Sequence, residues 1–338
     1  MTCFWLLSGL SLAVALVLTR FIRRYAVSRS LLDMPNARSS HTVPTPRGGG
    51  AAIVVTYLFG LVALAVAGVL PLPVLLALLG GGGWVALVGW LDDVRDISPH
   101  LRLGAHFIGA AWALACLGGL PPLPGIPPGM GAAVNALAAV YLVWLLNLYN
   151  FMDGIDGIAG IEAITVCLGG AVLYAVTAPG ETAWMLPVLL IASVAGFLYW
   201  NFPAAAIFMG DAGSGFLGFV LGVFSIQAAW AAPELFWGWV ILLGAFVADA
   251  TVTLLRRAVH GIKVYEAHRS HAYQHAARRY GSHAPVSIAF GAINLLWLLP
   301  VAVLTVTSTL NPLAGIALAY APLVLAALLL GSGNDQPA

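Results

Sequence analysis

Residues 72–93 have the sequence LPVLLALLGGGGWVALVGWLDD, in which a long run without any charge ends in two adjacent aspartates. A transmembrane α-helix needs about 20 predominantly apolar residues, and this run is long enough to provide them. The stretch therefore predicts a membrane-spanning helix that delivers Asp92 and Asp93 to one membrane surface.

The composition of the whole chain also indicates a membrane protein. Of its 338 residues 61% are hydrophobic and only 8% are charged, whereas a soluble domain carries about 25% charged residues. Backbone exposed to lipid must satisfy its own hydrogen bonds, and the apolar runs are too long and uninterrupted for the alternating strands of a β-barrel. The sequence predicts an all-α polytopic membrane protein with a single domain over residues 1–338.

The positive charges indicate how the chain is threaded through the membrane. All 14 Lys and Arg residues fall in the segments 20–47, 95–102 and 256–279, which share one face if the predicted helices alternate in direction. Cytoplasmic loops carry the Lys/Arg excess, so we expect this face to be cytoplasmic, the N-terminus outside and the C-terminus inside. Eleven transmembrane helices are expected, at about 2–19, 48–70, 72–91, 104–120, 132–152, 158–178, 184–200, 213–231, 235–255, 286–308 and 313–331.

Most acids and histidines also map to this inner face. The outer turns contain almost no side chain suited to chemistry, so an active site is expected on the cytoplasmic side. Its candidate catalytic loops are the inner segments at about 20–47, 92–103, 147–157, 201–212 and 256–285.

The first inner loop combines Arg38, His41 and Arg47 with three glycines that open the next helix. Arg and His donors beside the backbone N–H groups of a helix start suit an anionic, phosphate-bearing ligand. A positive-inside loop that binds lipid headgroups has the same composition. Both interpretations stay open from the residues alone.

The second loop begins with the Asp92–Asp93 pair. Adjacent carboxylates repel each other unless a base or a cation stabilises them. Arg95 and Arg102 provide a structural solution. A divalent metal is the functional one, since Mg²⁺ prefers one or two carboxylates together with substrate phosphates. We favour the metal or catalytic interpretation.

The third loop, NLYNFMDGIDGIAG, places Asn147, Asn150, Asp153 and Asp156 at intervals of three residues. On a helix this spacing projects side chains toward one side. An Asp facing lipid at mid-bilayer costs roughly 2.5–3.5 kcal/mol, so these side chains are expected to face a water-filled cleft. A solvated turn would explain the glycines but not the asparagines.

The fourth loop, NFPAAAIFMGDAGSGFLGF, places Asp211 in a Gly-rich turn that opens a helix. Backbone N–H groups there can bind a phosphate while the carboxylate holds a metal ion. Asn201 and Phe208 lie just upstream and suit a nucleobase by hydrogen bonding and stacking. Helix packing by small residues would account for the glycines alone.

The fifth loop contains YEAHRSHAYQHAARRYGSH and is the most polar part of the chain. His268, His271 and His275 have the spacing of one face of a short helix. With neighbouring arginines such as Arg269, this face is expected to bind pyrophosphate; an amphipathic interfacial helix is the alternative. Asp249, within a predicted span, is either a functional acid or the buried partner of an Arg or His.

Taken in order, the five segments resemble the polyprenyl-phosphate N-acetylhexosamine-1-phosphate transferase superfamily (glycosyltransferase family 4 type). The resemblance is carried by DMPNARSSH with PTPRGGG, the Asp92–Asp93 pair, NLYNFMDGIDG and FMGDAGS. It implies that a polyprenyl phosphate attacks the β-phosphorus of a UDP-sugar and that UMP leaves. It also implies a requirement for Mg²⁺, with Mn²⁺ as a substitute.

The resemblance further implies residue roles. Asp211 would be the principal Mg²⁺ ligand with Asp92 or Asp93 beside it, and Phe208 would stack on the uracil. The catalytic candidates are Asp92, Asp93, Asp153 and Asp156, among which the sequence does not separate base from metal ligand. The expected substrate-binding residues are Arg38, His41, Arg47, Asn147, Asn150, Asn201, Phe208, His268, Arg269 and His271.

The HRSHAYQ form of the fifth loop resembles the branch that initiates O-antigen or capsule synthesis with an N-acetylated 6-deoxyhexose. The expected partners are undecaprenyl phosphate, a UDP-N-acetyl sugar and membrane lipid at the bacterial inner membrane, without nucleic acid. The sequence fixes neither the sugar nor the oligomeric state, so a homo-oligomer stays open. The alternative function is a polytopic transporter of an anionic solute, which one-sided chemistry does not favour.

Overall fold

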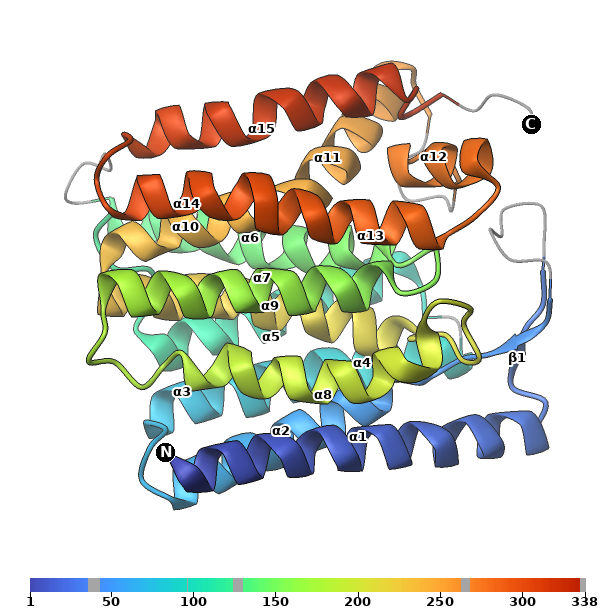
Figure 1. The fold of residues 1–338 in the computed structure, drawn as a ribbon, viewed down its shortest axis with the longest axis horizontal. Coiled ribbons are helices and arrows are strands. Elements are labelled where there is room, and N and C mark those ends of the chain that lie inside the picture. The colour runs from blue at the N-terminus through green and yellow to red at the C-terminus, as the bar shows by residue number, and fades with distance from the viewer. Residues whose placement is uncertain (36–42, 96, 124–129, 263–267, 335–338) are drawn as a thin grey trace.

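The computed structural model describes residues 1–35, 43–95, 97–123, 130–262 and 268–334. These residues form a bundle of helices with one short antiparallel ribbon, in which β1 (Leu32–Asp33) pairs with β2 (Thr45–Pro46) (Figure 1). The predicted all-α class is confirmed. The helices are α1 (Thr2–Ser28), α2 (Gly50–Val66), α3 (Leu72–Leu76), the π-helical η1 (Ala77–Gly82), α4 (Gly83–Arg95), α5 (Pro99–Leu117), α6 (Gly131–Met152), α7 (Ile158–Thr177), α8 (Met185–Asn201), α9 (Asp211–Ala231), α10 (Pro233–Leu242), α11 (Gly244–Val259), α12 (Ala272–Tyr280), α13 (Ala284–Ile293), the π-helical η2 (Asn294–Leu298), α14 (Leu299–Val306) and α15 (Pro312–Leu329).

Each of the eleven predicted segments is helical, but fewer have the length and apolarity of a membrane span. Seven helices among the described residues qualify, or eight if α10 and α11, bent by 64° at their junction, count as one span. The apolar helices α2 and α8 have 17 residues each, so each reaches only about 25 Å. A multi-pass architecture is therefore established, while eleven crossings and their orientation stay predictions.

Helix α9 lies at the centre of the bundle. In its most apolar window 94% of the residues are buried, against 28% for α1 and 17% for α15. Its first turn lies against the start of α2, where a Cβ on Gly50 would stand 2.4 Å from the Cα of Gly213. Only glycines permit this backbone approach. Asp211 is thereby positioned beside the first inner loop.

Two boundaries differ from the sequence prediction. Helix α1 continues to Ser28, so the first inner segment begins inside a helix. The extension is stabilised by Arg23, whose Nε donates to the carbonyl of Ala206 at 3.1 Å. In the fifth segment α12 starts only at Ala272, so the predicted helical face of three histidines is wrong: His268 and His271 precede the helix.

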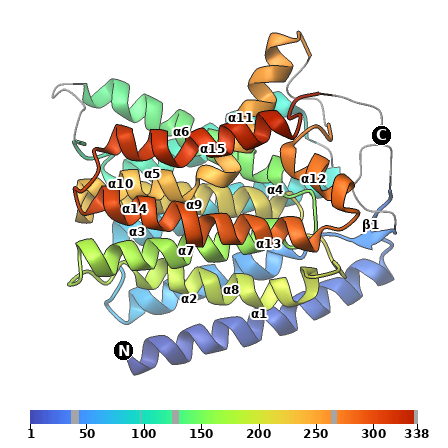
Figure 2. The same cartoon turned by 45° about the horizontal axis from the view of Figure 1, so that its top comes forward.

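The polar ends of the bundle gather on one side. The N-terminus of α1 lies at one end of the bundle, and β1 and α12 lie at the other (Figure 1). The view turned by 45° shows the same arrangement (Figure 2). Described residues from all five predicted inner loops therefore meet at a common end, where the candidate site is found.

Candidate active site

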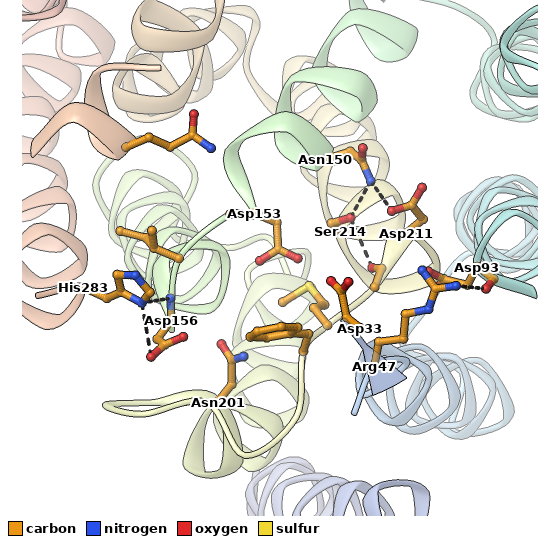
Figure 3. Close-up of a pocket in the computed structure, with 16 residues that line it drawn as sticks. Asp33, Arg47, Asp93, Asn150, Asp153, Asp156, Asn201, Asp211, Ser214 and His283 are labelled. Atoms are coloured by element: carbon orange, nitrogen blue, oxygen red, sulfur yellow. Dashed lines mark hydrogen bonds and ion pairs between the residues drawn. The ribbon is translucent and has the colours of Figure 1, made fainter. Parts of the chain in front are cut away.

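A cavity of about 230 Å³ lies at this end of the bundle. It is polar, and its side chains come from elements far apart in the chain (Figure 3). The lining residues are Asp33, Arg47, Asp93, Asn150, Asp153, Gly154, Ile155, Asp156, Asn201, Phe208, Met209, Gly210, Asp211, Ser214, Gln274 and His283.

The two adjacent aspartates at the end of α4 separate. Asp93 lines the cavity, and its Oδ2 accepts the backbone N–H of Ala212 at 3.3 Å. Asp92 is buried beside α5, where it pairs with Arg102 and accepts the backbone N–H of Ile97 at 2.8 Å. Consecutive residues differ by about 100° around a helix, so one carboxylate joins two helices while the other faces the cavity.

Asp211 opens α9 and is held from two sides. The Asn150 side-chain amide donates to Asp211 Oδ1 at 2.9 Å and to Ser214 Oγ at 3.0 Å. On the other side, Arg102 Nη1 lies 3.5 Å from Asp211 Oδ2. These contacts fix the end of α6 to the first turn of α9, so the cavity has a defined carboxylate wall.

Asp153 and Asp156 lie on the connection between α6 and α7. The pKa of Asp153 is raised to about 7, chiefly because burial disfavours the charged form, with added repulsion from Asp211 and Asp93. Asp156 Oδ2 lies 3.3 Å from Nδ1 of His283, and the Ser287 hydroxyl donates to the Asp156 carbonyl at 2.7 Å. Figure 3 draws Asp153 between the Asn150–Asp211 contact and the His283–Asp156 contact.

The connection between α8 and α9 supplies Asn201 and Phe208. Asn201, only 4% exposed, accepts the N–H of Gly157 at 2.9 Å and donates to the carbonyl of Ile207 at 2.9 Å. One amide proton and one lone pair remain for a ligand. The Phe208 N–H donates to the Pro46 carbonyl at 2.8 Å and its carbonyl accepts from Gly49 at 2.9 Å, which leaves the ring at the cavity.

The first inner loop contributes its second half to the cavity. Arg47, which follows β2, lines the cavity and donates from its guanidinium to the Asp93 carbonyl. Asp33 on β1 lines it as well. Arg38 and His41, expected to bind substrate, lie outside the described residues, so their roles stay predictions.

Several predicted site residues do not line this cavity. Asn147 donates to the Val143 carbonyl at 2.7 Å within its own helix. It borders a much smaller space beside Arg102 and Asn150. The others outside the main cavity are Asp92, His268, Arg269 and His271.

The fifth loop is organised around the buried Asp249 instead. Asp249 Oδ1 lies 3.6 Å from Nδ1 of His271, whose side chain is 2% exposed. His268 stacks on His271 with 4.8 Å between ring centroids. The sequence left two roles open for Asp249, a functional acid or the buried partner of an Arg or His. The structure favours the buried-partner role.

Four of the lining residues with polar side chains were not among the predicted site residues: Asp33, Ser214, Gln274 and His283. Ser214 stands three residues after Asp211 in a helix, so the i, i+3 rule could have found it. Gln274 and His283 sit in the polar fifth segment, but nothing in their spacing relates them to Asp153 or Asp156.

Three carboxylates of the cavity are the candidate ligands for a cation. No three His, Cys, Asp or Glu side chains in the described part of the chain are arranged to hold a metal ion by themselves. Asp93, Asp153 and Asp211 nevertheless line one space, where like charges favour a bound cation. This donor set suits a cation completed by oxygens of a ligand.

The chain is similar to known transferases. Residues 75–229 match the model of glycosyl transferase family 4. A probable undecaprenyl-phosphate N-acetylglucosaminyl 1-phosphate transferase of Bacillus subtilis (strain 168) is 27% identical over 285 residues, which are 82% of this chain and 78% of that protein. A decaprenyl-phosphate N-acetylglucosaminephosphotransferase of Mycolicibacterium smegmatis is 28% identical over 244 residues, 62% of this chain and 56% of its own. The segment matched to the family includes the cavity residues from Asp93 to Ser214.

Proposed function

We propose that this chain, a sugar-phosphate transferase of the polyprenyl-phosphate N-acetylhexosamine-1-phosphate transferase superfamily, transfers a sugar-1-phosphate from a UDP-sugar to undecaprenyl phosphate. An oxygen of the lipid phosphate forms a bond to the β-phosphorus. The bond from that phosphorus to the bridging oxygen breaks, and its electron pair leaves with UMP. The product would initiate a lipid-linked cell-surface polysaccharide such as O-antigen at the cytoplasmic face of a bacterial inner membrane.

The observation that carries the proposal is the convergence of Asp93, Asp153 and Asp211 from three separate elements on one cavity. Phosphoryl transfer needs little covalent help from a protein, so catalysis depends on positioning and charge neutralisation. A carboxylate cavity at the polar end of an apolar bundle suits a lipid phosphate that meets a soluble nucleotide sugar.

The cavity residues fit Mg²⁺. Asp211 would be its principal ligand, and Asp93, which lines the cavity whereas Asp92 does not, would lie beside it. When bound, the ion would neutralise charge on the pyrophosphate, and substrate oxygens would complete its coordination. The raised pKa of Asp153, about 7, lies close to the second pKa of a phosphate monoester, about 6. Asp153 is therefore suited to accept a proton from the lipid phosphate.

The nucleotide would lie toward Phe208 and Asp156. The Phe208 ring would stack on the uracil. The remaining amide proton and oxygen lone pair of Asn201 would form hydrogen bonds with the polar edge of the uracil. Arg47 would face the anionic part of the substrate. This orientation leaves the carboxylate wall of Asp93 and Asp211 for the diphosphate.

The donor sugar has two candidates. Both relatives above are named for N-acetylglucosamine transfer. The HRSHAYQ loop resembles the branch that uses an N-acetylated 6-deoxyhexose. Activity on both sugars would point to a permissive pocket.

The test is UMP release by the purified protein in detergent, with undecaprenyl phosphate, Mg²⁺ and a panel of UDP-N-acetyl sugars. UMP is expected only when lipid, metal and the correct donor are all present. A preparation that unfolds cooperatively yet releases no UMP from any donor would contradict the proposal.

A further inference from the structure

Helix α12 is anchored at its first turn by a carboxylate from another helix. Asp249 of α11 accepts the backbone N–H of Ala272 at 2.8 Å and that of Tyr273 at 2.9 Å, and Thr253 donates to it at 3.2 Å. The first N–H groups of a helix have no partner within the helix, and Asp249 satisfies two of them. Its side chain is only 4% exposed, so the anchor is shielded from water.

The same turn of α12 contacts the loop that carries two of the cavity aspartates. The Tyr273 hydroxyl donates to the Phe151 carbonyl at 3.1 Å, in the last turn of α6 where carbonyls lack helical partners. A Cβ on Gly154 would stand only 2.1 Å from the Tyr273 hydroxyl oxygen. Gly154 does not have a positive φ, so the need for glycine here is a need for space.

Tyr273 acts on the cavity from outside it. Its side chain is 1% exposed and does not line the cavity, whereas Asp153, Gly154 and Asp156 do. Burial, with repulsion from Asp249 and Asp153, raises the pKa of Tyr273. A raised pKa favours the protonated hydroxyl, which is the form that donates to the Phe151 carbonyl.

We propose that Tyr273 is a positioning residue that sets the loop of residues 153–157 through its hydroxyl contact with Phe151 and Gly154, while Asp249 holds Tyr273 in place. The proposal rests on the proposed transferase function for its kinetic readout, but the geometry that carries it is independent of the substrate. It assigns to the fifth loop a role in shaping the carboxylate site from behind.

The first experiment removes the hydroxyl alone. Tyr273→Phe is expected to lower kcat about three- to tenfold, the range for loss of one intramolecular hydrogen bond. KM for the nucleotide sugar should change less than kcat, because the Tyr273 side chain does not itself line the cavity. The matched control is Tyr320→Phe, which removes a hydroxyl bonded to the Val240 carbonyl at 2.8 Å, away from the site. Equal kinetics in the two variants would overturn the proposal.

The second experiment tests the contact by suppression. Gly154→Ala is expected to displace the loop and lower kcat about a hundredfold, as misplacement of catalytic groups by about 1 Å can do. In Gly154→Ala/Tyr273→Phe the nearest ring atom would be Cζ, 3.2 Å from the new methyl, a tight contact that small shifts relieve. The double variant should therefore be faster than Gly154→Ala and close to Tyr273→Phe. A double variant as slow as Gly154→Ala would refute the contact.

A third measurement does not depend on turnover. Hydrogen exchange of the peptides that cover residues 150–157 should be faster in Tyr273→Phe than in the wild type, and unchanged in Tyr320→Phe. Asp249→Asn should also accelerate exchange in α12. If no donor gives UMP, accelerated exchange still supports the positioning role while the transferase proposal fails. Unchanged exchange in Tyr273→Phe would overturn the positioning role by itself.

Discussion

Asp92 and Asp93 are neighbours in the chain, but only Asp93 lines the cavity. Asp92 forms a half-shielded ion pair with Arg102 and bonds the N–H of Ile97, so it fastens α4 to the start of α5. Asp93 faces the cavity and bonds the N–H of Ala212 at the start of α9. One motif therefore divides into a carboxylate that supports the scaffold and a carboxylate that faces the substrate space.

Substitution of the two aspartates should separate stability from activity. Asp92→Asn is expected to lower the Tm in detergent by several degrees. Loss of one partner of a buried ion pair costs about 3–5 kcal/mol. The cost is expected to be smaller here, because Arg102 is partly exposed. Asp93→Asn should leave the Tm nearly unchanged and lower kcat at least tenfold. Differential scanning fluorimetry with the UMP assay checks both, and equal Tm losses would contradict the division.

Asp211→Asn should abolish UMP release and its dependence on Mg²⁺ without unfolding the protein. The substituted amide keeps an oxygen that can accept from Asn150, so the contact between α6 and α9 can survive. The measurement is turnover across a Mg²⁺ titration, with the Tm as the control for folding. Normal turnover in this variant would remove Asp211 from the metal site.

Phe208→Ala should raise KM for the nucleotide sugar more than it lowers kcat, because stacking on the uracil stabilises the ground state and transition state alike. The backbone bonds of Phe208 to Pro46 and Gly49 remain in the variant, so the loop is expected to hold its path. Phe208→Tyr, which keeps the ring, is the control. A wild-type KM in Phe208→Ala would place the uracil elsewhere.

The stability of the metal-free protein should fall as the pH rises from about 4 to about 7. Asp153 has a folded-state pKa of about 7, above the value near 3.9 of an unfolded chain, so the folded state binds the extra proton in this interval. Above pH 7 Asp153 is charged in the folded state, and the full cost of burying that charge lowers the free energy of unfolding. Asp153→Asn should therefore raise the Tm at pH 8 in the presence of a chelator, and the gain should shrink toward pH 4.

A gain in Tm that is the same at both pH values would show that charge on Asp153 is not its cause. Addition of Mg²⁺ at pH 8 should narrow the difference in Tm between wild type and Asp153→Asn. Burial is the main cause of the raised pKa of Asp153, and a cation near Asp93 and Asp211 would offset the repulsion that adds to it.

The inner-face carboxylates could be predicted because they are charged residues next to long uncharged apolar stretches. Asp153 ends a long apolar run and Asp211 begins one, and a charge at such a position is costly unless it faces water or a partner. The motif order then indicated that they meet. The structure places both, with Asn150, Phe208 and Asn201, around one cavity.

The fifth loop shows where this reasoning fails. The spacing of His268, His271 and His275 predicted one helical face, yet α12 begins after His271. The helix starts where Asp249, more than twenty residues earlier, accepts its first N–H groups. A local period cannot report such a cap, because the partner comes from another helix.

The sequence by itself determined that the chain is an all-α membrane protein, since segments that lie in lipid are long, apolar and uncharged. It also predicted that the chemistry lies at one end, where the charged residues gather. The sequence also predicted a candidate site that contains Asp92, Asp93, Asp153, Asp156 and Asp211, without separating the roles of Asp92 and Asp93. Only the tertiary structure decided that Asp92 pairs with Arg102, that Gln274 and His283 reach the cavity, and that His271 does not. The physical reason is that periodicity records which face of a helix is buried, whereas the neighbour buried against that face depends on how the helices pack.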